Sequence, residues 1–302
     1  MLSETIKTLR KQAGMSQEQL AGRLNVSRQA VTKWETAAGT PDVENLRAIS
    51  ALFQISLDDL LENRSPIPPE QEFRFHSVTE YDIDSIKDFD ITFSGANGVV
   101  MTGYEGEKLQ VLLGSDQIAN LDSAFKVKID DIKKRIDVDV RRFAGMTESN
   151  AKESLHILIR LPQQYVGKIE LSGNTQSLEL QNVRAENAEF SGKVSRTLLN
   201  GFSGRLELNS NTDMEITCHD LNGPLDVNQV SATSRLTLPQ GLPFCTVTRG
   251  ILNSIHYQQD GETAKDFSLR GEDAGHCDNV IELNGIKSEL IINASSHKIP
   301  LK

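Results

Sequence analysis

The chain has 302 residues, of which 38% are hydrophobic and only 5% aromatic, so it is long enough for two domains with mainly aliphatic cores. Its net charge of −10 argues against a chain that binds nucleic acid along its whole length, and no apolar run reaches the roughly 18–20 residues of a membrane span. The N-terminus is not a signal peptide, and three widely spaced cysteines fit a reducing compartment, so we expect a cytoplasmic protein with no membrane partner.

The charge is divided unevenly along the chain. Residues 1–40 carry six basic and three acidic side chains, whereas residues 1–64 carry eight of each, so all ten excess negative charges lie farther on. This acidic remainder should weaken non-specific binding to phosphates and leave affinity to a small specific surface. The basic side chains of the first 40 residues are Lys7, Arg10, Lys11, Arg23, Arg28 and Lys33.

The first elements are predicted to be helices. Residues 3–12 have helical spacing of apolar side chains, and residues 16–36, SQEQLAGRLNVSRQAVTKWET, predict two short helices joined by a tight turn. Ser16 is a good N-cap, and Gln19, three residues on, completes a capping box. Asn25 tolerates a left-handed backbone and can therefore end the first short helix sharply.

The second short helix begins after Ser27, another good N-cap. Trp34 is the only tryptophan of the chain and could stack on a ligand, but its place on the inner face favours core packing. The outer face carries long hydrogen-bond donors, which is what the reading of a major groove requires. These outer residues are Arg28, Gln29, Thr32 and Lys33.

The pattern of these residues resembles the helix-turn-helix of the lambda-repressor-like (Cro-type, XRE) DNA-binding family. The residues that carry the resemblance are Gln17, Leu20, Ala21, Leu24, Val26, Val31, Trp34 and Glu35, with Asn25 in place of the glycine that is commonest at the turn. The resemblance covers about residues 1–63. It implies a five-helix domain that binds double-stranded DNA in the major groove.

The resemblance also implies roles for single residues. The residues expected to read bases are Arg28, Gln29, Thr32 and Lys33; arginine favours guanine and glutamine favours adenine. The residues expected to contact the DNA backbone are Gln17, Ser27, Lys7 and Arg10. A merely solvated helix face is the alternative.

A fourth helix is predicted over residues 43–53 and a fifth from Ser56 through Leu61. The following segment ENRSPIPPEQE (62–72) contains three prolines, which forbid a helix and favour a stiff, extended linker. We therefore divide the chain into a DNA-binding domain (1–63), a proline-rich linker (64–72) and a β-strand-repeat domain (73–302).

Beyond the linker the hydrophobic period changes to that of β-strands. Short strands recur at a nearly constant spacing of nine or ten residues, marked by Glu170, Glu179, Glu189, Leu198, Glu207, Ile216, Asp226 and Leu236. A constant period of strands too short to bury a face alone is typical of stacked coils and favours a β-solenoid-like domain. A β-sandwich is the alternative, but it need not keep so regular a spacing. The expected fold is thus multidomain, helical first and then β.

The segment LPQQYVGKIELSGNTQSLELQNV resembles the start of the bacterial β-strand-repeat domains known as adhesin-like, over about residues 86–292. This resemblance implies a fold. It implies little about activity, because the family shares no catalytic motif.

The residues that could form a chemical site are better explained as ordinary structural or solvated side chains. Cys218–His219 and His276–Cys277 lack the spacing of a zinc site, and alternating acids on a strand are usually solvated. The acids in question are Asp130, Asp131, Asp137 and Asp139. No phosphate-binding glycine loop or nucleophile elbow occurs either, so we expect no catalytic residue, metal, cofactor or enzymatic activity.

The sequence therefore predicts a DNA-binding transcriptional regulator, which acts as a repressor or as an activator. Its β-repeat domain would mediate oligomerisation, sense an unidentified effector, or both. One helix-turn-helix reads few base pairs, so we expect a homodimer or higher oligomer on a palindromic operator. A DNA-tethered interaction scaffold is the alternative.

Overall fold

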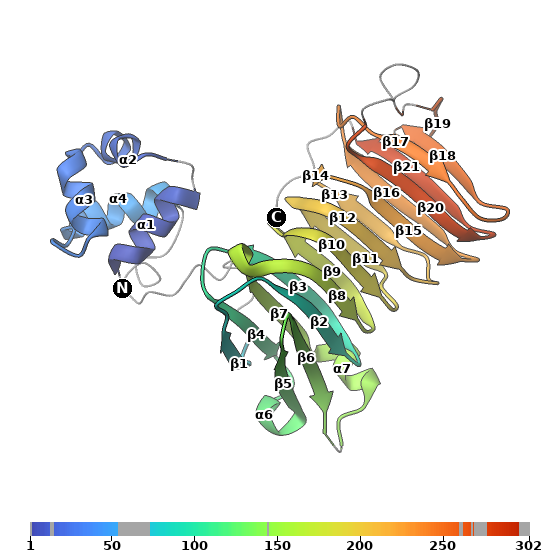
Figure 1. The fold of residues 1–302 in the computed structure, drawn as a ribbon, viewed down its shortest axis with the longest axis horizontal. Helices are drawn as coiled ribbons and strands as arrows, with labels where there is room; N and C mark the ends of the chain where they lie inside the picture. Colours follow the sequence, from blue (N-terminus) through green and yellow to red (C-terminus); the bar gives the residue numbers. More distant parts are fainter. Residues whose placement is uncertain are drawn as a thin grey trace. The chain divides into compact units, whose positions relative to one another are not determined.

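The computed structural model describes residues 2–12, 15–53, 73–143, 145–259, 262–266, 268 and 277–295. The chain divides into two compact units, Met1–Glu72 and Phe73–Lys302 (Figure 1). The first is helical and the second is a large β-sheet domain. The linker proposed at 64–72 and the fifth helix predicted from Ser56 lie outside the described residues.

The described part of the first unit contains four helices: α1 (Leu2–Gln12), α2 (Gln17–Leu24), α3 (Arg28–Glu35) and α4 (Val43–Phe53). Their apolar faces form one buried cluster in which Ile6, Leu20 and Val31 are fully inaccessible to solvent. Trp34 belongs to this cluster and is 7% exposed, which confirms its predicted place in the core.

The second unit is built from two open sheets (Figure 1). In spatial order, the first sheet contains β1 (Phe75–Asp82), β4 (Lys108–Ser115), β7 (His156–Pro162), β3 (Ala96–Tyr104), β9 (Thr175–Gln181), β11 (Arg196–Asn200), β13 (Glu215–Cys218), β16 (Thr233–Pro239), β21 (Glu289–Ser295), β18 (Ser254–Gln259) and β19 (Glu262–Thr263).

The second sheet contains, in spatial order, β17 (Cys245–Thr248), β20 (Val280–Ile286), β15 (Leu225–Val230), β12 (Phe202–Asn209), β10 (Arg184–Ser191), β8 (Val166–Ser172), β2 (Lys87–Phe93), β6 (Arg135–Arg142) and β5 (Phe125–Ile132). The short strand β14 (Leu221–Asn222) pairs with β12. The short helices α6 (Leu121–Ala124), α7 (Glu148–Ser154) and η1 (Gln163–Tyr165) lie between strands.

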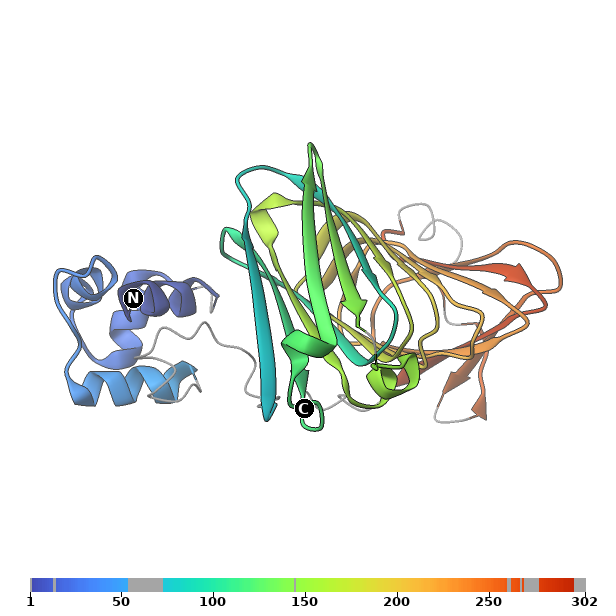
Figure 2. The ribbon, with the colours of Figure 1, turned by 90° about the horizontal axis from the view of Figure 1, so that it is seen from below.

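From β8 onward the chain alternates between the two sheets, as can be followed in Figure 2. Each strand pairs in parallel with the strand two predicted repeats away, so Glu170 aligns with Glu189, Glu189 with Glu207, and Glu207 with Asp226. The inward-facing apolar residues of both sheets form a single buried cluster. Consecutive strands of the regularly spaced series thus belong to alternate sheets, and strands two repeats apart are neighbours in the same sheet.

The last two long strands break this order. β20 and β21 come last in the chain, yet they lie between β15–β16 and β17–β18 in the two sheets. We call residues 245–259, which contain β17 and β18, the capping coil, because β17 is the terminal strand of its sheet.

Glycines allow the close stacking of these coils at one corner. A Cβ atom on Gly285 would lie 1.7 Å from the carbonyl oxygen of Gln229, and one on Gly250 would lie 2.1 Å from the carbonyl oxygen of Gly285. Both glycines have positive φ angles, +139° and +90°. A side chain at either position would therefore meet both crowding and backbone strain.

Candidate nucleic-acid interface

The corner between α2 and α3 has the local geometry that the sequence predicts. The amide of Gln19 donates to Ser16 Oγ (3.1 Å), and the amide of Ser16 donates to Gln19 Oε1 (2.7 Å), which completes the capping box. Asn25 is left-handed, with φ 57° and ψ 37°. Ser27 caps α3 by accepting from the amide of Ala30 (3.1 Å).

The outer face of α3 is exposed. Arg28, Gln29 and Lys33 are solvent-accessible, and none of them makes a side-chain hydrogen bond or ion pair within the part of the chain that the structure describes. The hydroxyl group of Thr32 lies 3.0 Å from the carbonyl oxygen of Arg28 and 3.1 Å from Gln17 Oε1. Three of the four predicted base-reading side chains thus have free polar ends, whereas Thr32 is tied to its own helix and to α2.

Behind this face, Glu35 joins α1, α2 and α3. Arg10 donates from Nε (2.5 Å) and Nη2 (2.9 Å) to the two carboxylate oxygens of Glu35, and Gln17 Nε2 donates to the same carboxylate (2.8 Å). Arg10 Nη1 also donates to the carbonyl oxygen of Met15 (2.7 Å). The Glu35 side chain is only 2% exposed, so this network lies inside the domain.

The network perturbs both charged groups. Burial by itself would raise the pKa of Glu35, but the hydrogen bonds from Arg10 and Gln17 outweigh it and lower that pKa below its usual value. The hydrogen bonds that Arg10 donates to Glu35 are also the main reason why the pKa of Arg10 is raised. Both groups are therefore held in their charged forms.

The four residues predicted to contact the DNA backbone differ from one another in their surroundings. Lys7 is exposed on α1, and Ser27 lies at the start of α3 with its hydroxyl used as a cap. Arg10 and Gln17 point into the Glu35 network. The sequence contained a signal for this network: Glu35 follows Trp34 on the inner face of α3, and a buried carboxylate requires a charged or hydrogen-bonding partner.

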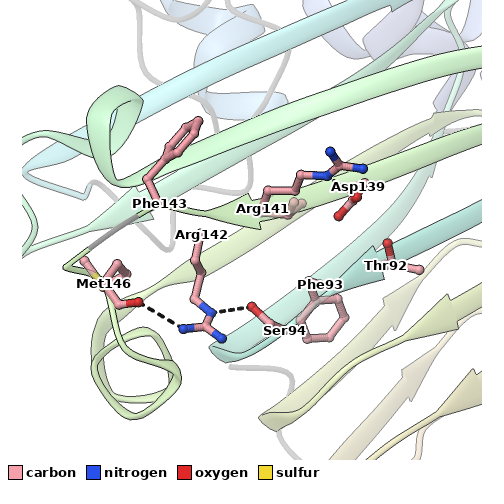
Figure 3. A pocket seen from close by; sticks show the side chains of 9 residues that line it. Thr92, Phe93, Ser94, Asp139, Arg141, Arg142, Phe143 and Met146 are labelled. Atoms are coloured by element: carbon pink, nitrogen blue, oxygen red, sulfur yellow. Dashed lines mark hydrogen bonds and ion pairs between the residues drawn. The ribbon is translucent and has the colours of Figure 1, made fainter.

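The β-sheet domain has a separate open cavity of about 610 Å³. Figure 3 shows Arg142 at its side, donating to Ser94 Oγ (2.6 Å) and to the carbonyl oxygen of Met146 (2.9 Å). Arg141 pairs with Asp139 (2.5 Å), and Phe143 is 46% exposed. No pattern in the sequence marks this cavity, because its residues come from strands that are distant in the chain.

The four clustered acids of β5 and β6, of which Asp139 lines this cavity, are each paired with a cation. Asp131 pairs with Lys87, Asp137 and Asp139 with the nearby Arg135 and Arg141, and Asp130 with Lys128. Within the residues that the structure describes, no group of three or more potential ligands could hold a metal ion. None of the helices described is both long and apolar enough for a membrane span.

Comparison with known families shows which type of domain the first unit contains. Residues 6–60 match the family described as Helix-turn-helix. The N-terminal domain is a helix-turn-helix domain of the XRE type. It is 44% identical over 59 residues to the HTH-type transcriptional activator BcrR of Enterococcus faecalis, and 38% identical over 65 residues to the HTH-type transcriptional regulator YqaE of Bacillus subtilis.

These two matches cover 20% and 22% of this chain, and they span only 29% and 56% of the lengths of those relatives. A third relative, the SPbeta prophage-derived regulator YonR of Bacillus subtilis, is 28% identical over 114 residues, which is 37% of this chain and 94% of YonR. Beyond the helix-turn-helix domain, these regulators therefore leave most of this chain unmatched.

Solved structures similar to the chain include a candidate cell-adhesion protein of Clostridium sporogenes, with 11% identity and a TM-score of 0.35, covering 73% of this chain and 100% of that one. A candidate adhesin of Bacteroides fragilis has 11% identity and a TM-score of 0.33, with 73% and 97% of the two chains covered. A likeness at this level says nothing about activity.

Proposed function

We propose that the chain is a cytoplasmic, sequence-specific transcriptional regulator that places α3 in the major groove of double-stranded DNA. One observation carries this proposal: the outer face of α3 presents Arg28, Gln29 and Lys33 with free polar ends, while its inner face packs in the core. Long donors on the front of such a helix can reach the edges of bases. Thr32 lies on the same face and is proposed to contribute through its methyl group.

The Glu35 network divides the remaining residues by role. Arg10 is committed to Glu35 and Met15, so we propose that it positions α1 against α3 rather than binding a phosphate directly. Gln17 links Glu35 to Thr32 at the start of α2, which orients that helix against α3. Lys7 and Ser27 are proposed as contacts to the DNA backbone.

A selection of bound sequences from random DNA duplexes by the full-length protein tests the main proposal. We expect enrichment of one motif with two inverted half-sites, because a single helix-turn-helix reads few base pairs. Enrichment without any motif would contradict sequence-specific reading. A genomic binding map then separates a regulator, which should occupy discrete promoters, from the alternative of a DNA-tethered scaffold.

For the β-sheet domain we propose a two-sided solenoid rather than a sandwich. Two features support this architecture. From β8 onward the strands alternate between the two sheets, and neighbouring strands within each sheet pair in parallel. A sandwich made of hairpins would instead pair consecutive strands in antiparallel fashion.

We also propose that this domain holds two copies of the chain together through an apolar corner. Val230 aligns with Ile286, and Ile286 aligns with Ile251, so three exposed apolar side chains are adjacent; Leu252 follows directly. Their exposed fractions run from 45% to 73%. Adjacent exposed apolar side chains usually mark an interaction surface, and a second copy is the occupant that an operator with two half-sites requires.

Sedimentation of the full-length protein tests the apolar corner. Leu252→Ser should shift the protein toward monomer. Ile86→Ser changes an apolar residue of similar exposure (67%, against 73% for Leu252) elsewhere in the domain and should leave the assembly unchanged. Equal behaviour of the two variants would contradict the assignment.

Any effector would bind, we propose, in the cavity beside Arg142 and Phe143.

A further inference from the structure

Two of the three cysteines meet at the end of the β-sheet domain. Cys245 begins the edge strand β17, and Cys277 lies shortly before β20. The amide of Cys245 donates to the carbonyl oxygen of Asn279 (3.0 Å), and the thiol of Cys277 donates to the same oxygen (3.3 Å). Both cysteines therefore bond to one and the same carbonyl oxygen.

Asn279 holds this arrangement in place. It is 7% exposed, its Nδ2 donates to the carbonyl oxygen of Pro243 (3.1 Å), and its Oδ1 accepts from the amide of Gly223 (2.9 Å). The chain segments that carry the two cysteines are therefore fixed to a common buried residue. Their approach does not depend on the chance orientation of two surface side chains.

The third cysteine provides a contrast. Cys218 is completely buried in the core, and burial raises the pKa of its thiol to about 12. Cys245 and Cys277 are only half-buried, so small oxidants can reach them.

We propose that Cys245 and Cys277 form a built-in dithiol that closes to an intrachain disulfide under oxidising conditions. A disulfide such as oxidised glutathione is the oxidant. One cysteine thiolate attacks it and releases one glutathione thiol; the second cysteine thiolate then displaces the second glutathione. The two cysteines lose two protons and two electrons in total, and the oxidant is reduced to two thiols.

This disulfide bond would attach the capping coil covalently to the segment that precedes β20. In the second sheet β17 is the terminal strand and pairs with β20, whereas β18, the other strand of the capping coil, pairs with β21 in the first sheet. Cys245 belongs to the capping coil, and Cys277 leads into the strand that β17 pairs with. Closure would therefore add a covalent link between β17 and the segment that leads into β20, and would close the chain between the two cysteines into a loop.

The same surroundings set the rate of closure. Burial, together with the neighbouring thiol of Cys245, raises the pKa of Cys277 to about 11, so this thiol is almost entirely protonated at neutral pH. Because the thiolate is the nucleophile, closure should be slow at pH 7 and should accelerate as the pH rises toward 9.

The test equilibrates the reduced full-length protein in glutathione buffers of increasing oxidised fraction and follows intact mass and tryptic peptides. We expect a mass loss of about 2 Da and one peptide pair linked through Cys245 and Cys277. Cys218→Ala is the matched control and should close as the wild type does. Cys245→Ser and Cys277→Ser should each abolish the 2 Da loss, about two hydrogens.

A second measurement keeps the proposal testable if a serine variant fails to fold. Amide hydrogen exchange of the wild-type protein should slow about tenfold or more in β17 after oxidation, with α2 and α3 unchanged as internal references. The proposal is overturned if the wild type shows no 245–277 link in fully oxidised glutathione. Linkage through Cys218, or linkage only between separate chains, would overturn it as well.

Discussion

Glu35 is the residue on which the arrangement of the helix-turn-helix depends most. Its carboxylate is almost fully buried and accepts hydrogen bonds from α1 and α2, although it belongs to α3. A buried carboxylate left without such partners would cost several kcal/mol, whereas here the partners come from the two helices that α3 must contact. The ion pair with Arg10 therefore specifies how these helices meet.

Glu35 should make the stability of the domain depend on pH. Its pKa is lower in the folded domain than the unfolded value of about 4.5, so its contribution is present above pH 4.5 and is lost as the pH falls through the folded pKa. Glu35→Gln should lower the free energy of unfolding by about 1–3 kcal/mol at pH 7 and flatten the acid dependence. Urea unfolding between pH 3 and about 7 measures both effects. An unchanged acid slope would show that Glu35 does not set it.

Arg28 belongs to the recognition surface rather than to the core. Arg28→Ala should weaken binding to the selected site by about 1–3 kcal/mol and relax one base position, because a bidentate arginine contact discriminates among bases. Titrations on selected and random duplexes at one salt concentration measure this. Arg47→Ala, which removes an exposed arginine from α4, serves as the control. Equal losses of affinity on both DNAs would mean that Arg28 contacts only phosphates.

At the scale of elements, α3 is too short to be stable alone. It has eight residues, and isolated helices shorter than about 12–15 residues are marginal in water. Its stability must therefore come from the inner face, where Val31 and Trp34 pack against the other helices.

Trp34→Ala should accordingly unfold the N-terminal domain. The loss of a buried tryptophan costs roughly 3–5 kcal/mol, which is a large part of the stability of a domain this small. Thermal melting of the variant, followed by circular dichroism in the helical region, measures it. If melting is unchanged while DNA binding is lost, Trp34 acts at the interface instead.

In the β-sheet domain, the corner glycines determine how closely neighbouring coils can stack. Gly285→Ala should destabilise the domain by roughly 2 kcal/mol or more, because the new Cβ would collide with the backbone of Gln229. Gly241→Ala is a matched control: its φ is also positive (+84°), but no atom lies within 4 Å of the added Cβ. Denaturant unfolding should show a clearly larger loss for Gly285. Equal losses would indicate that backbone strain, and not crowding, dominates.

At the scale of the whole molecule, we propose that the first unit binds DNA and that the second unit joins two copies of the chain. A chain ending at residue 65 should remain a folded monomer that binds one half-site weakly, because the apolar corner that we propose as the dimer contact lies in the second unit. It should lose the cooperative occupation of two half-sites that linkage supplies. Light scattering and a half-site titration measure these properties. A dimeric fragment with full-length affinity would contradict the proposal.

The sequence by itself determined the features that depend on neighbours along the chain. The caps at Ser16 and Ser27 and the left-handed turn at Asn25 were predictable, because each rests on contacts within three or four residues. The short β-strands followed from alternation within a few residues in the same way. The regular strand spacing also favoured stacked coils.

Only the tertiary structure decided the features that depend on distant residues. The pairing of Arg10 with Glu35, the approach of Cys245 and Cys277 to Asn279 and the insertion of β20–β21 ahead of the capping coil all join distant segments, and no local pattern shows which segments meet. Local spacing predicts which face a side chain occupies, but not which other face it meets. That choice depends on the packing of the whole domain, where each buried charge and each strand edge must find a partner.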